Sequence, residues 1–220
     1  MNRLLFEKTG DAVYLSHLDL MRIFQRAFRR ADILILHSQG VSPRAYVSIA
    51  LPLSVGVASR CEILDFDIED GSADLAALPE LLNRTMPAGL RVLQASESAV
   101  KIKHLTYLQS ELVLEYDNGL PSGAEAALAA LFAQDELLVE KRSKKGGMVD
   151  VDLKPLLRSL SLHALSPQEL CIDCLASAQN PGMNPQLLVS AVSRHLPALP
   201  PDFARIRRIE IFDEQMEVFR

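Results

Sequence analysis

The sequence lacks the features of exported and membrane-spanning proteins. Its 220 residues contain only three cysteines, Cys61, Cys171 and Cys174, and an odd number in a long chain without an export signal does not indicate a disulfide framework. No apolar run approaches the roughly 20 residues that cross a bilayer. Glu7 interrupts the N-terminal stretch before a long apolar segment develops, which argues against a signal peptide or an anchor. We therefore expect a cytoplasmic protein.

Aromatic residues are also scarce, at 5% of the chain, and tryptophan is absent. Because unpaired bases are commonly bound by stacking on aromatic side chains, few stacking platforms are expected. The net charge of −5 argues against unspecific coating of nucleic acid. The charge is uneven, however: residues 1–60 carry eight Lys/Arg against four Asp/Glu, residues 61–100 two against eight, and residues 141–158 six against two. Local basic patches therefore remain candidate sites for a polyanion.

The hydrophobic pattern predicts an α+β fold. Hydrophobic residues make up 49% of the chain, which excludes a disordered protein and allows two domains of about 100 residues each. The first half is expected to follow the order β-α-β-β-α-β. Its expected strands lie at 3–7, 33–36, 46–51, 61–69 and 90–95, with 33–36 and 46–51 on either side of a polar loop, and its expected helices at 16–31 and 74–86.

The second half repeats this order less closely. Its expected strands lie at 108–116, 137–140, 148–153, 157–163, 169–175 and 205–212, and its expected helices at 122–132 and 184–195. We therefore predict two tandem ferredoxin-like (βαββαβ) modules with antiparallel sheets. The first module spans residues 1–100, and the second, with an extra strand, spans residues 101–220.

The helix after Ser16 is the clearest element in the sequence. Ser16 and Asp19 have the spacing of a capping box, in which each side chain bonds the backbone of the other. At about 100° per residue, the apolar residues fall on one arc and the polar residues on the opposite arc. The apolar arc is expected to pack on the sheet, and the opposite arc carries Arg22, Arg26, Arg29 and Arg30.

Two features suggest chemistry, and each has a plainer interpretation. His17 beside Asp19 and several arginines could act as a general acid–base group, but we favour Asp19 as a helix cap and keep His17 as a catalytic candidate. Cys171 and Cys174 are spaced like a metal or redox pair. They fall in an alternating strand, so their side chains should point to opposite faces, and we predict buried structural cysteines. No metal site and no cofactor are predicted, and the remaining histidines, His163 among them, are expected to be structural.

The arginine arc could contact phosphates or be an ordinary solvated helix face. Two basic loops favour phosphate contact: one carries Arg44, and the other places four basic residues beside Gly146 and Gly147. The candidate binding residues are Lys8, Arg22, Arg26, Arg29, Arg30, Gln39, Gly40, Arg44, Lys141, Arg142, Lys144 and Lys145.

Several segments together resemble the bacterial radical-SAM-linked protein family. They are Phe6-Glu7-Lys8-Thr9-Gly10, Leu15-Ser16-His17-Leu18-Asp19-Leu20-Met21-Arg22, Arg26-Ala27-Phe28-Arg29-Arg30-Ala31, Ala50-Leu51-Pro52-Leu53-Ser54-Val55-Gly56 and Glu140-Lys141-Arg142-Ser143-Lys144-Lys145-Gly146. The resemblance covers nearly the whole chain. It implies a protein encoded beside, or fused to, a radical-SAM protein. The activity of the family is not established, so the resemblance assigns no catalytic residues.

Three functional hypotheses follow. The first is an accessory protein of a radical-SAM enzyme that binds or presents an RNA or RNA-linked substrate, since this chain has no C-x3-C-x2-C run of its own for a cluster. The second is an RNA-processing enzyme with His17 as acid–base group, and the third a non-catalytic scaffold. The duplicated plan is also similar to the repeat-RNA-processing proteins of CRISPR systems, an analogy of fold alone. We favour a role without catalysis, with a radical-SAM protein and RNA as partners and no membrane contact.

Overall fold

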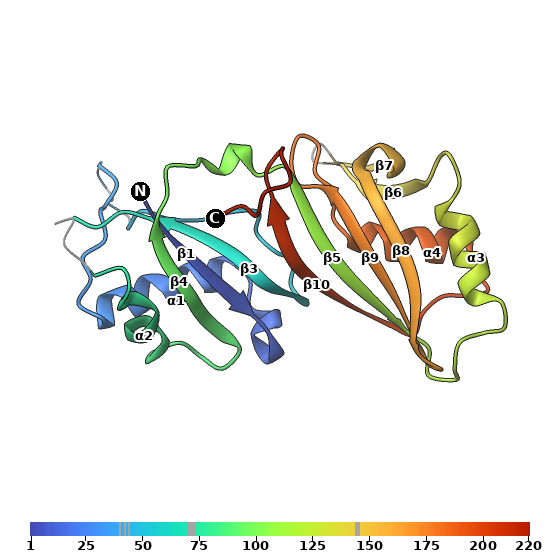
Figure 1. Ribbon diagram of the computed structural model, residues 1–220, viewed down its shortest axis with the longest axis horizontal. Helices are drawn as coiled ribbons and strands as arrows, with labels where there is room; N and C mark the ends of the chain where they lie inside the picture. The colour runs from blue at the N-terminus through green and yellow to red at the C-terminus, as the bar shows by residue number, and fades with distance from the viewer. Residues whose placement is uncertain (40, 42, 44, 70–73, 144–145) are drawn as a thin grey trace. The chain divides into compact units, whose positions relative to one another are not determined.

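The chain divides into two compact units. The computed structural model describes residues 1–39, 41, 43, 45–69, 74–143 and 146–220 (Figure 1). Unit 1 comprises Met1–His104 together with Val218–Arg220, and unit 2 comprises Leu105–Glu217. Each unit combines helices with an antiparallel sheet, which confirms the predicted α+β class. None of the described helices has the length and apolarity of a membrane span.

Unit 1 follows the predicted order β-α-β-β-α-β. Its elements are β1 (Asn2–Lys8), η1 (Gly10–Tyr14), α1 (His17–Arg30), β2 (Val47–Ile49), β3 (Val57–Phe66), α2 (Leu78–Asn83), β4 (Leu90–Glu97) and η2 (Ile102–His104). The strands lie in the order β4-β1-β3-β2, and every neighbouring pair is antiparallel. This order places β1 and β3 inside the sheet, so β1 is paired on both sides.

The predicted strand at residues 33–36 is not regular. Ile35 forms a single bridge with Ile68 and His37 another with Ala45, and the strand β2 starts only at Val47. Of this run only Ile35 is buried, while Leu34 is 60% exposed. A single buried side chain does not stabilise a continuous strand against the sheet. The apolar run 33–36 is therefore a partly exposed segment with isolated bridges.

Helix α1 packs its apolar arc on the sheet, as predicted. Leu20, Phe24 and Phe28 are buried. The ring centroids of Phe6 and Phe24 lie 4.8 Å apart in an edge-to-face arrangement, and those of Phe28 and Phe66 lie 4.8 Å apart. Such aromatic pairs add about 0.5–1.5 kcal/mol each to the burial of their surface. The core of unit 1 therefore fixes the rotation of α1 and leaves its polar arc outside.

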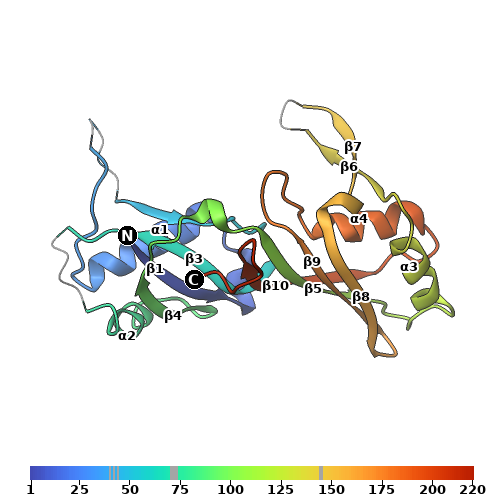
Figure 2. The ribbon, with the colours of Figure 1, turned by 45° about the horizontal axis from the view of Figure 1, so that its top comes forward.

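Unit 2 repeats this order around an inserted hairpin. Its elements are β5 (Tyr107–Glu115), α3 (Ala124–Phe132), β6 (Leu138–Arg142), β7 (Met148–Asp152), η3 (Lys154–Leu156), β8 (Leu157–Ser166), β9 (Glu169–Ser177), α4 (Gln186–His195) and β10 (Phe203–Phe212). The main strands lie in the order β10-β5-β9-β8, all antiparallel, and β6 pairs only with β7. Figure 2 shows the β6–β7 hairpin projecting from unit 2. All six predicted strand ranges of this half are present, which is two strands more than a βαββαβ module has, where the prediction named one extra strand.

The sheet of unit 2 has two different faces. Helices α3 and α4 cover one of them (Figures 1 and 2). Leu170, Ile172 and Cys174 of β9 are buried, and they alternate with Cys171 and Asp173, which point to the opposite face. The register places His163 and Ser161 of β8 on that opposite face too, beside Cys171 and Asp173. No helix of unit 2 covers this second face in the described residues.

Candidate nucleic-acid interface

The capping box predicted at the start of α1 is present. The backbone N–H of Asp19 donates to Ser16 Oγ at 3.2 Å, and the backbone N–H of Ser16 donates to Asp19 Oδ2 at 3.1 Å. Ser16 Oγ also donates to Asp19 Oδ2 at 2.6 Å. The side-chain and backbone hydrogen bonds from Ser16 are the main reason that the pKa of Asp19 is lowered. Asp19 therefore serves the helix terminus, and the first turn of α1 is held in place.

The arginines of α1 form an exposed face. Arg22, Arg26, Arg29 and Arg30 are all exposed. Within the described residues only Arg22 has an ion pair, with Nη1 at 3.9 Å from Asp19 Oδ1 and both side chains open to solvent. An exposed pair at this distance holds its partners weakly. The guanidinium groups are therefore available to an external anion.

A groove with a volume of about 1030 Å³ lies beside this face in unit 1. Arg22 and Arg29 line it together with apolar residues of α1 and of the following segment, such as Met21 and Ile33. Asp32 is the acidic residue of the lining among the described residues. The groove thus joins two cations to an apolar wall, which suits an anionic ligand that also carries a flat or apolar part.

Two histidines line the same groove. His17 begins α1, and its Nδ1 atom is buried without a hydrogen-bond partner among the described residues. His37 is about half exposed, and its Nδ1 atom lies 3.4 Å from Glu69 Oε1. The sequence singled out His17 but not His37, because no spacing in the chain links residue 37 to α1. Only the packing of the segment 33–37 beside the helix brings the two imidazoles to one groove.

The other candidates of the first half lie elsewhere. Lys8 is completely buried at the end of β1, so its ammonium group is not on a surface that could meet a polyanion, and its selection as a binding residue was wrong on this point. Gln39 is exposed in an irregular segment. Gly40 and Arg44 lie outside the described residues.

The second basic segment belongs to unit 2. Lys141 is half-buried and Arg142 exposed at the end of β6, where they pair with Val149 and Met148 of β7. Lys144 and Lys145 are outside the part of the chain that the structure describes. The expected strands at 137–140 and 148–153 pair with each other as the β6–β7 hairpin, and Gly146 and Gly147 have positive φ. Basic residues on β6 and exposed apolar residues on β7 therefore lie side by side.

Cys171 and Cys174, the two cysteines of β9, lie as predicted on opposite faces of the sheet. Both are buried, and burial is the main cause that raises the pKa of Cys171 to about 11 and that of Cys174 to about 12. The sequence missed the neighbours of Cys171: His163 stands opposite it on β8, and His163 Nδ1 is 3.6 Å from Asp173 Oδ2. A contact made by strand register between residues eight or ten apart leaves no spacing motif.

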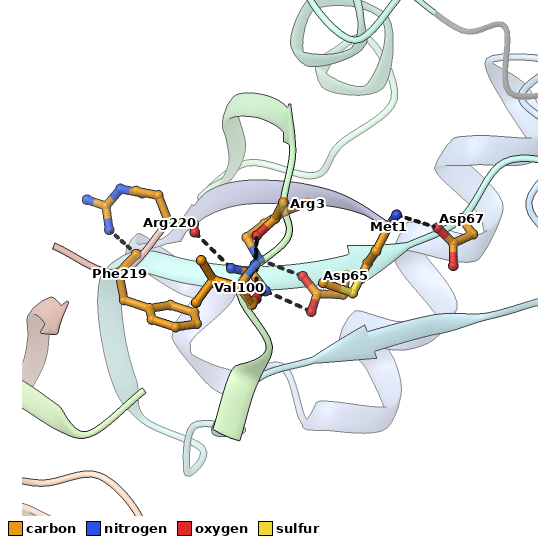
Figure 3. Close-up of polar contacts among 8 residues, drawn as sticks. Met1, Arg3, Asp65, Asp67, Val100, Phe219 and Arg220 are labelled. Carbon is orange, nitrogen blue, oxygen red and sulfur yellow. Dashed lines mark hydrogen bonds and ion pairs between the residues drawn. The ribbon is translucent and has the colours of Figure 1, made fainter. Parts of the chain in front are cut away.

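A buried ion pair in unit 1 is structural. Arg3 of β1 donates from Nε and Nη2 to the two oxygens of Asp65 at 2.7 and 3.0 Å (Figure 3). It also donates to the carbonyls of Val100 and Arg220 at 2.8 and 2.9 Å. The alternation of β3 predicted Asp65 on a polar face, yet it is 2% exposed. Because Arg3 engages these partners inside unit 1, the pair offers no binding surface.

Comparisons with known proteins give a family and a fold likeness. A family model described as an uncharacterized protein conserved in bacteria (DUF2344) matches residues 2–185. No curated protein matches the chain significantly. A chain from the crystal structure of a Cbf5-Nop10-Gar1 complex is similar with a TM-score of 0.52 and 8% identity, over 97% of this chain and 50% of that one.

A second solved structure is less similar to this chain. A chain from the structure of an H/ACA RNP bound to a substrate RNA containing 2'-deoxyuridine has a TM-score of 0.47 and 6% identity, over 94% of this chain and 46% of that one. The present chain thus spans about half the length of these chains. At 8% identity the first likeness shows a shared fold and nothing about ligands.

Proposed function

This chain belongs to the bacterial DUF2344 family of uncharacterized proteins, and we propose that it binds RNA through the arginine face and the groove of α1. The observation that carries the proposal is the row of exposed guanidinium groups beside the groove. Arg22 and Arg29 are seven residues apart, about 10 Å along the helix axis. Arg26 lies between them, so the three cations can meet successive phosphates of one strand.

Charge and shape favour a nucleic acid over a small anion. A single phosphate would engage one or two guanidinium groups, whereas the exposed face continues past the groove to Arg26 and Arg30. The apolar part of the lining, including Met21 and Ile33, offers a surface for a base next to the phosphate contacts.

The test compares two triple variants with the same change in charge. Arg22→Gln/Arg26→Gln/Arg29→Gln removes the proposed contacts, and Arg60→Gln/Arg84→Gln/Arg91→Gln removes three other exposed arginines of unit 1. Binding of labelled single-stranded RNA is measured by fluorescence anisotropy at several salt concentrations. The α1 triple should weaken binding and lower the slope of log K against log salt by about 2, since each single-strand phosphate contact contributes about 0.7.

The control triple decides between a site and diffuse attraction. It should leave the affinity within about threefold of the unchanged protein, because distant exposed charges are screened over roughly 10 Å. An equal loss in both triples would contradict a site on α1. A complete lack of RNA binding at low salt would leave the scaffold hypothesis in its place.

We also propose that each unit is a ferredoxin-like module. The support is the strand order: numbering the four main strands of each unit along the chain gives 4-1-3-2 in both cases, with all pairs antiparallel. In unit 2 the β6–β7 hairpin is inserted between the first helix and the second main strand. The proposed modules at residues 1–100 and 101–220 differ from the two compact units at their ends, because unit 1 extends to His104 and includes Val218–Arg220.

A radical-SAM protein is the proposed partner, as the resemblance of the sequence implies. Cys171 and Cys174 point to opposite faces of their sheet, so this pair offers no shared cluster site, and the partner would hold the cluster. Coexpression of the tagged chain with a radical-SAM protein from the same genome tests the proposal. Copurification in a fixed ratio is the expected result. Two well-folded proteins that never copurify would overturn it.

A second candidate function is RNA cleavage with His17 as acid–base group. The observation that favours it is that His17 lines the groove together with Arg22 and Arg29, and that its Nδ1 atom is buried without a hydrogen-bond partner among the described residues. Cleavage should fall at least about 100-fold in His17→Ala, in line with the usual contribution of a general acid or base. His104→Ala, outside the groove lining, is the matched control. Cleavage that survives in His17→Ala removes this candidate.

A further inference from the structure

Three different metal-ligand types meet on the second face of the unit 2 sheet. His163 comes from β8, and Cys171 and Asp173 come from β9. The strand register pairs His163 with Cys171, and Asp173 follows Cys171 by two residues on the same face. The ligand atoms of the three side chains all lie within 4.8 Å of one another, and His163 Nδ1 is 3.6 Å from Asp173 Oδ2. Among the described residues this is the one such group of three.

We propose that His163, Cys171 and Asp173 bind one divalent transition-metal ion of the Zn²⁺ type. Imidazole, thiolate and carboxylate are the three side chains that Zn²⁺ takes, at bond lengths of about 2.0–2.3 Å. Tetrahedral bonds of that length place ligand atoms roughly 3.3–3.8 Å apart. The His163–Asp173 separation of 3.6 Å already falls in this range, and the other separations, all within 4.8 Å, need to close by at most about 1 Å for a bound ion. A thiolate ligand argues against Mg²⁺ and Ca²⁺, which prefer oxygen.

An ion pair between His163 and Asp173 alone gives no reason for a buried cysteine beside the two side chains. Cys171 is 1% exposed and its sulfur lies within 4.8 Å of the ligand atoms of both partners, where a thiol adds little to the attraction between imidazole and carboxylate. The same thiol is a strong ligand once it gives up its proton to solvent on metal binding. Glu111, opposite Asp173 on β5, adds a further negative charge near the thiol and so favours a bound cation.

The scaffold is suited to hold ligands in fixed positions. The register between β8 and β9 is regular from Leu160 to Ala164, and β9 is paired with β5 on its other side. Ligands on a doubly paired strand are placed more rigidly than ligands on loops. A hollow of about 330 Å³ shares Asp173 with the cluster, and its lining combines polar residues such as Ser161 and Gln109 with apolar ones such as Phe212. Three protein ligands beside such a hollow leave room for water or a small molecule at the fourth position.

The experiment is a titration of the full chain with Co²⁺, followed by competition with Zn²⁺. Co²⁺ bound to a thiolate gives a near-ultraviolet charge-transfer band, which reports the sulfur ligand directly. One equivalent should bind, and Zn²⁺ should displace it. Cys171→Ala should abolish the band, while Cys174→Ala, a buried thiol of the same strand on the opposite face, should keep it. His163→Ala should lower the affinity by more than about 100-fold, since even outer-shell partners contribute 10–100-fold.

The His163→Ala variant distinguishes a loss of metal binding from a loss of folding. The His163 side chain is 50% exposed, so His163→Ala should keep the urea midpoint of the metal-free protein. A band that survives in Cys171→Ala, a band lost in Cys174→Ala instead, or the absence of stoichiometric binding would each overturn the site. Because all these residues lie in unit 2, the outcome is independent of RNA binding by α1.

Discussion

Arg3 is a buried charged residue of unit 1 that is held by several partners. Its guanidinium group is 2% exposed and makes four hydrogen bonds, two to Asp65 and one each to the carbonyls of Val100 and Arg220. The guanidinium carbon also lies 4.9 Å from the ring centroid of Phe219. A buried pair of this kind contributes little net stability over an apolar pair, yet each partner depends on the other, because a single buried charge is costly.

Arg3→Met should therefore destabilise the protein by about 3–5 kcal/mol, since it leaves the carboxylate of Asp65 buried without its partner. Urea unfolding followed by circular dichroism measures the loss. The double variant Arg3→Met/Asp65→Leu should recover part of it. Arg84→Met, which breaks the exposed pair with Glu80, is the control and should change stability little. Equal losses in Arg3→Met and Arg84→Met would contradict this account of the buried pair.

At the level of single residues the sequence predicts exposure better on helices than on strands. The helical period separated Arg22, Arg26 and Arg29 from the apolar arc, and all three are exposed. Lys8 and Asp65 lie on strands paired on both sides, where the alternation of residues does not say which face is covered. His163 and Cys171 meet through register alone. A prediction of that contact would have needed the pairing of β8 with β9, which no local pattern encodes.

At the level of elements, the start of α1 is fixed by local chemistry. Ser16 satisfies the backbone N–H of Asp19 and receives the Asp19 carboxylate in return. Ser16→Ala should lower stability by about 0.5–2 kcal/mol and weaken RNA binding, because fraying of the first turn moves His17 and Arg22. Thermal unfolding and anisotropy measure the two effects. Ser122→Ala is the matched control.

The control is informative because the same pattern fails at α3. Ser122 and Glu125 have the spacing of a capping box, but α3 begins after Gly123, which has a φ of 77° and no side-chain cap. Gly123 takes the N-cap position one residue after the serine, so no capping box forms at Ser122. Ser122→Ala should therefore leave stability nearly unchanged. A loss as large as that of Ser16→Ala would contradict the capping account.

At the level of the whole molecule, the sequence predicted the order of the elements but not the arrangement of the β6–β7 hairpin. Both halves show the β-α-β-β-α-β order because turns and alternation mark their strands locally. The sequence also located the two runs on either side of Gly146 and Gly147. The sequence did not show that these two runs form a hairpin separate from the main sheet. That outcome depends on β8, and not β6, being the strand that pairs with β9.

The C-terminal residues return to unit 1 after the last strand of unit 2. Val218–Arg220 belong to unit 1, Phe219 is 2% exposed there, and the Arg220 carbonyl accepts from Arg3. Removal of residues 218–220 should cost unit 1 about 3 kcal/mol or more, as for the loss of a buried phenylalanine. Hydrogen exchange should then quicken in β1 and β3 while β5 and β9 stay protected. Arg220→Ala keeps the backbone carbonyl and should have a smaller effect, so an equal effect of substitution and deletion would assign the role to the side chain instead.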